Sequence, residues 1–168
     1  MKFINNSQKI YNFYFCYIIL MDNLVIRNLE IADFHKRYLN LLSELTESNN
    51  ICYEKWEERI NQINENKNHN IFVIEDKGNI IASITLIIEL KFFRNLSSVA
   101  HIEDVIVSKK YRKQGIADKL IKYCINFSKK ENCYKIILNC NNNLTKFYEK
   151  FGFTNKNQEM SLYLIPKL

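Results

Sequence analysis

Glycine is rare in this chain, and each of its three glycines predicts a place where the backbone must turn. Glycine adopts positive φ readily and weakens helix and strand interiors. Gly78 lies in Asp76-Lys77-Gly78-Asn79 between two β-branched runs, which predicts a β-hairpin. Gly152 follows a short amphipathic segment and is expected to end a helix. Gly115 fits neither explanation, because it lies inside the basic segment SKKYRKQGIADKL at 108–120.

The spacing of apolar residues predicts an α+β domain. Strand-like runs and alternation occur at 24–28, 71–75, 80–90, 99–107, 134–140 and 158–165. Helical spacing occurs at 31–45, 53–64, 116–127 and 144–151. The expected order is therefore β-α-α-β-β-β-α-β-α-β, without repeats or a domain linker.

The length of 168 residues suits one domain, which we expect at 21–168. Residues 1–20 form an extension whose apolar run at 11–20 is too short to span a bilayer. We expect this extension to be disordered or locally packed, with Met21 as an alternative start, rather than the centre of a signal peptide. No other segment is apolar enough for stable membrane insertion.

The net charge of +6 favours an anionic partner, which could be nucleic acid, a membrane surface or a phosphorylated small molecule. The five cysteines are scattered and form no CxxC pair, and the three histidines are far apart. This spacing predicts reduced thiols and no metal site. Lysines without clustered aromatic residues beside them argue against nucleic acid.

Gly115 lies between a strand that ends near Val107 and a helix that begins near Ile116. The first N–H groups of a helix have no partner within it and attract anions. Arg112 and Lys113 add positive charge, and Ala117 leaves room for close approach. The pattern predicts a diphosphate site, the alternative being a solvated basic turn capped by glycine. It is neither a GxxxxGK loop nor a GxGxxG loop.

The segment RKQGIA at 112–117 matches R/Q-x-x-G-x-G/A, the acyl-CoA diphosphate loop of the GNAT acetyltransferase superfamily. Three ordered blocks, HIEDVIVSKKYRKQGIADKLI, CYKIILNC and KFYEKFGF, make the chain resemble the glucosamine-6-phosphate N-acetyltransferase family over about 24–164. The resemblance implies a GNAT fold, with a mixed, mostly antiparallel sheet that is splayed between the strands at 99–107 and 134–140.

The resemblance also implies acetyl-CoA as co-substrate, with no metal, and direct transfer to the 2-amine of glucosamine 6-phosphate. It implies a cytoplasmic homodimer acting in hexosamine biosynthesis. The alternatives are a GNAT enzyme for another amine (a protein N-terminus, a polyamine or an aminoglycoside) and a non-catalytic acyl-CoA-binding module.

The resemblance implies a bulge in the strand segment Ile102-Glu103-Asp104-Val105. It places the cofactor on this strand, the following loop and two later segments, with main-chain contacts from Val105 and Val107. A bulge frees strand N–H groups, and donors aimed at a developing oxyanion lower the barrier. The implied cofactor residues are Val105, Ile106, Val107, Arg112, Lys113, Gln114, Gly115, Ile116, Ala117, Asn139, Asn143 and Tyr148.

For catalysis, the amine must be neutral to attack, so we expect the carboxylate of Glu103 or Asp104, or its backbone carbonyl, to accept the proton with the help of a water molecule. The resemblance implies that Tyr148 protonates the leaving thiolate. The residues alone leave open a surface edge for the two acids and a core aromatic role for Tyr148. For the sugar phosphate, it points to Thr46, Lys91, Arg94, Glu103, Asp104, Tyr134 and Lys135.

The chain departs from the family pattern at Asn139, Leu144 and Tyr163, which stand in place of Asp, Asn and a basic residue. Asn143 is a candidate to replace the pantetheine contact of the missing Asn. Lys113, in place of the usual glycine, is expected to face solvent.

Overall fold

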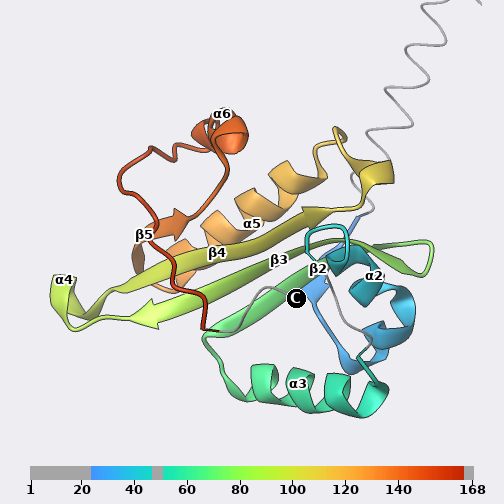
Figure 1. Cartoon of the computed structure of the whole chain (residues 1–168). Helices are drawn as coiled ribbons and strands as arrows, with labels where there is room; N and C mark the ends of the chain where they lie inside the picture. Colours follow the sequence, from blue (N-terminus) through green and yellow to red (C-terminus); the bar gives the residue numbers. More distant parts are fainter. Residues whose placement is uncertain (1–23, 47–50, 165–168) are drawn as a thin grey trace, which may run out of the picture.

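A five-stranded sheet forms the centre of the molecule (Figure 1). The computed structural model describes residues 24–46 and 51–164, so the expectations for residues 1–20 lie outside the described residues. The strands, in spatial as well as sequence order, are β1 (Ile26–Asn28), β2 (His69–Asp76), β3 (Asn79–Leu90), β4 (Ser98–Val107) and β5 (Cys133–Leu138).

The sheet is mixed, as expected. The pairs β1–β2, β2–β3 and β3–β4 are antiparallel, whereas β5 runs parallel to its neighbour, β4. A parallel pair needs a long crossover, which here is α5 (Ile116–Lys130). The predicted β2–β3 hairpin is confirmed, with positive φ at both Lys77 and Gly78.

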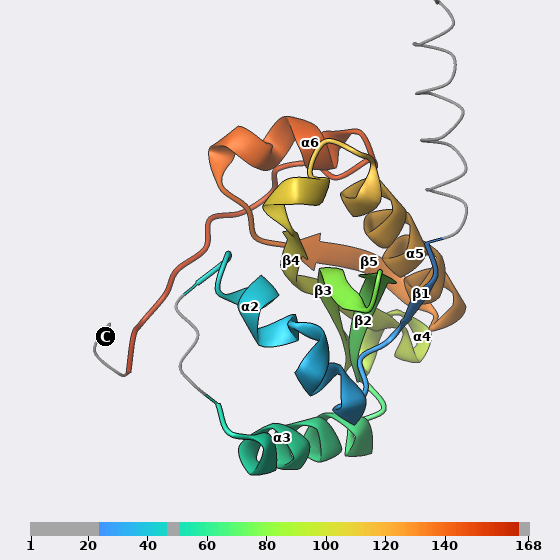
Figure 2. The same ribbon diagram turned by 90° about the vertical axis from the view of Figure 1, so that its right-hand side faces the viewer.

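Helices cover both faces of the sheet (Figure 2). On one face, α5 places Ile116, Leu120 and Ile121 against buried β3 and β4 residues such as Ile84 and Ile102. On the other, the 3-10 helix η1 (Ile31–Lys36), α2 (Tyr38–Leu42) and α3 (Tyr53–Glu65) pack a second cluster. Burying apolar side chains on both faces stabilises the strand framework that carries the site.

The single helix expected at 31–45 was wrong. Arg37 has left-handed backbone angles, with φ of 62°, and it separates η1 from α2. Asp33 explains the short first turn, because its buried carboxylate accepts hydrogen bonds from the Glu30 N–H at 2.9 Å and from Arg27. The contacts of Asp33 fix the orientation of η1, so the chain turns at Arg37 before α2 begins.

The chain after β5 contains the 3-10 turn η3 (Asn142–Leu144) and α6 (Thr145–Glu149). Gly152 follows with φ of 89°, and its N–H donates to the Glu149 carbonyl at 3.0 Å, as expected for a glycine that closes a helix.

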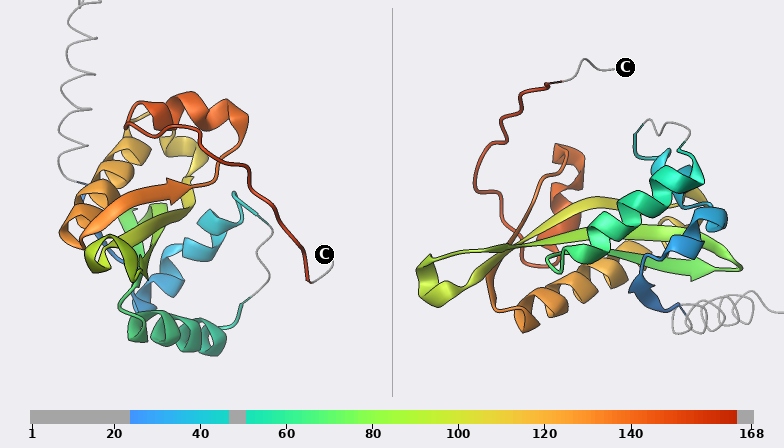
Figure 3. Two further views of the ribbon diagram at one scale, coloured as in Figure 1. Left: turned by 90° about the vertical axis from the view of Figure 1, so that its left-hand side faces the viewer. Right: turned by 90° about the horizontal axis from the view of Figure 1, so that it is seen from below.

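The strand predicted at 158–165 was wrong over the described residues, which run to Leu164. This C-terminal segment has no strand pairing and extends away from the layered body (Figure 3). Met160, Leu162 and Leu164 are 95, 85 and 87% exposed. Strand alternation alone does not supply a sheet edge to pair with.

Candidate active site

A bulge in β4 lies at the position that the resemblance implied. Ser83 of β3 faces Ile106, but Thr85 faces Glu103, so β4 carries an extra residue between these pairs. Asp104 lies in this bulge with φ of 49°. A left-handed conformation is unfavourable for a residue with a side chain and often marks a functional site. The bulge turns Glu103 and Asp104 out of the regular strand pattern.

The strands β4 and β5 separate beyond the bulge. Their pairing ends at Ile102 and Leu138, whereas β4 continues to Val107. Among the described residues, no strand pairs with the β5-facing edge of β4 from Glu103 to Val107. The splayed opening predicted between these strands is therefore confirmed, and the main chain of Val105 and Val107 lies along it.

The basic loop follows directly on β4. It contains the 3-10 turn η2 (Lys109–Tyr111), and it ends at Gly115, which has φ of 71° and precedes the first residue of α5. The positive φ explains why glycine is present at this position. Lys113 also has positive φ, at 61°, where the family pattern has glycine. The loop thus presents the start of a 15-residue helix beside the β4 edge.

The Arg112 side chain is already bound within the protein. Its Nε donates to the Val107 carbonyl at 2.9 Å, and Nη2 lies 3.3 Å from Oε2 of Glu44. Sequence reasoning missed Glu44, because a single glutamate after an amphipathic helix gives no signal of a contact 68 residues along the chain.

Glu103 is partly buried beside the bulge. Burial raises its pKa above the ordinary value, and the negative charges of Asp104 and Glu159 act in the same direction, while His101 opposes them. A carboxylate with a raised pKa is a better proton acceptor than an ordinary surface glutamate. His101 in turn lies 3.1 Å from the Glu89 carboxylate. His101 lies two residues before Glu103 in the same strand, and this spacing is a sequence signal for its electrostatic effect on Glu103.

Tyr148 is 7% exposed and belongs to the core cluster under α5. Its ring makes edge-on contacts with Phe147 and Phe153 at centroid distances of 5.0 and 6.0 Å. Burial and, to a smaller extent, Cys140 raise the pKa of its hydroxyl. Tyr148 is therefore protonated at neutral pH, as a proton donor must be.

The structure brings two of the cationic residues predicted for the sugar phosphate, Arg94 and Lys135, against the ring of Tyr134. The Arg94 guanidinium lies 4.8 Å from the centre of the Tyr134 ring, and Lys135 lies 5.7 Å from it. Lys91 is ion-paired to Glu89. Arg94 belongs to the short turn α4 (Phe93–Leu96) at the end of the β3–β4 hairpin, where it has left-handed angles. In register, Lys135 pairs with Val99, about 13 Å along β4 from Glu103.

Three other predicted residues lie outside the strand framework. Thr46 follows the end of α2. Asn139 comes directly after β5 ends, and Asn143 lies in η3. All three are exposed.

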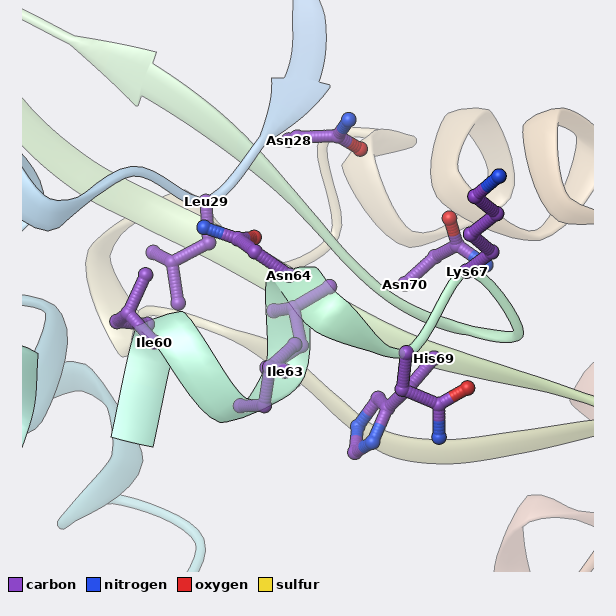
Figure 4. A pocket seen from close by; sticks show the side chains of 10 residues that line it. Asn28, Leu29, Ile60, Ile63, Asn64, Lys67, His69 and Asn70 are labelled. Atoms are coloured by element: carbon purple, nitrogen blue, oxygen red, sulfur yellow. The ribbon is translucent and has the colours of Figure 1, made fainter. Parts of the chain in front are cut away.

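A separate hollow of about 120 Å³ lies between the end of α3 and the edge of β1 and β2 (Figure 4). Its walls include Asn28, Asn64, Lys67 and His69 over apolar Ile60. None of its lining residues belongs to the predicted site.

The described residues also limit the other kinds of site that the fold could hold. No helix there is long and apolar enough to cross a membrane. No group of histidine, cysteine and acidic side chains in the described part could hold a metal ion. Cys52, Cys124, Cys133 and Cys140 are free thiols.

Comparison with known proteins agrees with this geometry. The sequence model of the Acetyltransferase (GNAT) family matches residues 30–153. A glucosamine 6-phosphate N-acetyltransferase of Arabidopsis thaliana is 36% identical over 147 residues, which cover 86% of this chain and 99% of that protein. Glucosamine 6-phosphate N-acetyltransferase 1 of Dictyostelium discoideum is 37% identical, covering 89% and 98% of the two chains. The crystal structure of the Arabidopsis enzyme superposes with a TM-score of 0.81, covering 85% of this chain and 99% of that one.

Proposed function

Because this chain belongs to the GNAT family of acetyltransferases, and is similar along most of its length to glucosamine 6-phosphate N-acetyltransferases, we propose that it acetylates glucosamine 6-phosphate. The acetyl group of acetyl-CoA passes to the 2-amine, giving N-acetylglucosamine 6-phosphate and CoA. The observation that carries this proposal is the bulged, unpaired edge of β4, which leads into the loop before α5.

Acetyl-CoA lies in this proposal along the β4 edge, with its diphosphate at the start of α5. The N–H groups of the first helical turn and the positive end of the helix dipole stabilise the phosphate charge. Main-chain groups of Val105 and Val107 bind the pantetheine arm and orient the thioester. The set of residues around the cofactor is the one predicted from the resemblance, with Asn139 and Asn143 at the far side of the opening.

The amine nitrogen attacks the thioester carbonyl carbon, a C–N bond forms and the C–S bond breaks. Glu103 accepts the proton that the amine loses, directly or through a water molecule, and Asp104 supports it by raising its pKa. Tyr148 donates its hydroxyl proton to the departing thiolate. No covalent intermediate with the enzyme is needed, because acceptor and donor bind together.

The sugar phosphate is held by Arg94 and Lys135, which lie against the Tyr134 ring. Lys91, which is ion-paired to Glu89, is a further candidate ligand. Guanidinium and ammonium groups bind phosphate through charge-assisted hydrogen bonds. Thr46, which is exposed after the end of α2, is a further candidate ligand.

We also propose that the protein is a cytoplasmic homodimer. The C-terminal segment supports dimerisation, because its alternate apolar side chains at Met160, Leu162 and Leu164 lie exposed in one protomer. Glu159 in this segment influences the pKa of Glu103, so the interface would lie beside the acceptor site. Free thiols at four cysteines agree with a reducing compartment.

The test is release of free thiol from acetyl-CoA with a panel of acceptors: glucosamine 6-phosphate, glucosamine, spermidine, an aminoglycoside and a peptide with a free N-terminus. We expect glucosamine 6-phosphate to react at least about a hundredfold faster than glucosamine, because two charge-assisted contacts contribute about 3 kcal/mol. Reaction with a non-phosphorylated acceptor alone would overturn the choice of substrate. Binding of CoA without turnover of any acceptor would favour the acyl-CoA-binding module.

A further inference from the structure

Glu44 connects the helical layer to the basic loop. It lies two residues after the end of α2, and its side chain is partly buried against the segment that follows β4. Oε2 accepts a hydrogen bond from the Lys109 N–H at 2.9 Å and lies 3.3 Å from Nη2 of Arg112. Oε1 accepts a longer hydrogen bond, of 3.4 Å, from the Ser108 hydroxyl.

These contacts make Glu44 a cap that comes from a distant part of the chain. The turn η2 begins after Ser108, whose side chain makes no capping hydrogen bond to it. The Glu44 carboxylate satisfies the first N–H of this turn, and its negative charge lies at the end of the turn where it is favourable. Arg112 extends the connection, because its Nε binds the carbonyl of Val107, the last residue of β4.

A second hydrogen bond holds the other side of the same turn. The Tyr111 hydroxyl donates to Oδ2 of Asp76 at 2.7 Å, from the end of β2. The turn η2 is thus anchored to α2 and to β2 before the chain reaches Lys113 and Gly115. Both of these residues have positive φ, and a strained turn persists only where its surroundings hold it.

Glu44 does not occupy the position expected for phosphate. Its main-chain partner is Lys109, at the β4 end of the loop, whereas the N–H groups that open α5 lie after Gly115. A carboxylate that imitated phosphate would bind at the α5 end. Glu44 therefore holds the loop at its β4 end and does not bind the N–H groups at the start of α5.

We propose that Glu44 is a positioning residue for the diphosphate of acetyl-CoA, acting through Lys109 and Arg112 to preorganise the loop before α5. This inference depends on the proposed function, since it needs the diphosphate to bind at this loop. In this arrangement the Arg112 side chain supports the loop rather than contacting phosphate through Nε, which is already bound.

The experiment compares two acetyl donors that differ in the diphosphate. Acetyl-CoA carries it, whereas S-acetylpantetheine presents the same thioester and pantetheine arm but lacks the diphosphate together with the adenosine 3′-phosphate. Glu44→Ala removes the cap, Glu44→Gln keeps an acceptor for the Lys109 N–H but loses the charge that pairs with Arg112, and Glu58→Ala is the control at an exposed carboxylate of α3.

We expect Glu44→Ala to raise the KM for acetyl-CoA about five- to tenfold, the effect of losing one helix cap. Turnover at saturating acetyl-CoA, the KM for glucosamine 6-phosphate and kcat/KM for S-acetylpantetheine should stay within about twofold of wild type. Glu44→Gln should lie between Glu44→Ala and wild type, and Glu58→Ala should match wild type. A change confined to the donor with a diphosphate is not produced by general loss of structure.

Three results would overturn the inference. If Glu44→Ala lowers kcat/KM equally for both donors, Glu44 contributes to stability alone. If the variant has a lower KM for acetyl-CoA, the Glu44 carboxylate competes with phosphate. If no kinetic parameter changes, Glu44 has no role in cofactor binding. Calorimetric titration of the wild-type protein with CoA separates these results from failure of the proposed function. If the wild type does not bind CoA, the function is wrong, and if it binds as tightly as Glu44→Ala, only the inference is wrong. Should Glu44→Ala not fold, Glu44→Gln carries the same comparison.

Discussion

At the scale of single residues, Gly115 is the position where backbone conformation and ligand chemistry coincide. Its φ of 71° disfavours any side chain, and the space beside it is where the proposed diphosphate approaches. Gly115→Glu should raise the KM for acetyl-CoA at least about tenfold, because a carboxylate repels phosphate at close range. Steady-state kinetics with varied acetyl-CoA measure this.

Gly78→Ala is the matched control for backbone strain. Gly78 also has positive φ, at 75°, but no described atom beyond its two chain neighbours lies within 4 Å of where its Cβ would be. It should lose about 1 kcal/mol of stability and keep the wild-type KM. An unchanged KM in Gly115→Glu would remove the loop from the cofactor site.

The dependence of kcat/KM on pH tests the proton acceptor, because the charge of Asp104 raises the pKa of Glu103. Glu103 must be deprotonated to accept a proton, so kcat/KM should fall as the pH drops through its raised pKa. Asp104→Asn removes one of the negative charges that raise this pKa, while Glu159 and His101 remain. The acid limb of the profile should therefore move to lower pH. Asparagine tolerates positive φ, so the bulge should keep its shape.

Glu103→Gln is the companion variant in this test. It should lose about 100-fold or more in turnover and lose the acid limb, as removal of a general base does. An acid limb that stays in place in both variants would assign the titration to another group.

Tyr148→Phe separates proton donation from packing. The ring contacts with Phe147 and Phe153 survive the change, and only the hydroxyl is lost. Turnover should fall about tenfold or more, with less than about a twofold change in the KM for acetyl-CoA. A raised KM with unchanged turnover would instead make the hydroxyl a binding group.

At the scale of elements, a buried ion pair joins β1 to η1. Asp33 is fully buried, and Arg27 donates to both of its carboxylate oxygens, at 2.6 and 2.8 Å, as well as to Glu75. Burial by itself would raise the pKa of Asp33, but the hydrogen bonds from Arg27 and from the Glu30 N–H outweigh it and hold this pKa below its ordinary value.

Asp33→Asn should therefore lower the free energy of unfolding by about 3 kcal/mol, since it leaves Arg27 without its main partner. The stabilisation by Asp33 is complete above the unfolded pKa of about 3.9, and it is lost as the pH falls through the depressed folded pKa. Urea unfolding at pH 7 and at pH 3 measures both effects, and the variant should differ less from wild type at the lower pH.

Local patterns in the sequence predicted most strands and the two long helices correctly, because each buries a regular apolar face. The interruption of the helix at Arg37 was not predictable, because it depends on the ion pair between Asp33 and Arg27 across the β1–η1 junction. The strand at 158–165 was predicted from alternation, which cannot show that a paired edge is missing. Within the site, the Gly115 loop followed from the residues, whereas the bulge at Asp104 came from a resemblance. The brace from Glu44 needed the three-dimensional structure.

At the scale of the whole molecule, the exposed C-terminal segment should control assembly. Removing residues 158–168 takes away the apolar side chains at Met160, Leu162 and Leu164 without touching a described strand or helix. Sedimentation velocity should show a dimer for the full chain and a monomer for the truncated one. A truncated chain that remains a dimer would place the interface elsewhere. A monomeric full chain would contradict the homodimer itself.

The separation of β4 from β5 divides the molecule into two parts, β5 with α6 and the strands β2, β3 and β4, which should differ in how readily they open locally. Within the described part of the chain, strand pairing joins β5 to the rest of the sheet only along Ser98 to Ile102 of β4, whereas β2, β3 and β4 pair along most of their lengths. Amide protons of β5 and α6 should thus exchange with deuterated water sooner than those of the central meander. A nucleotide thioester bound between the two parts would contact both and would slow the local opening that permits exchange. Binding would therefore lower the exchange rates even of amide protons that lie far from the ligand.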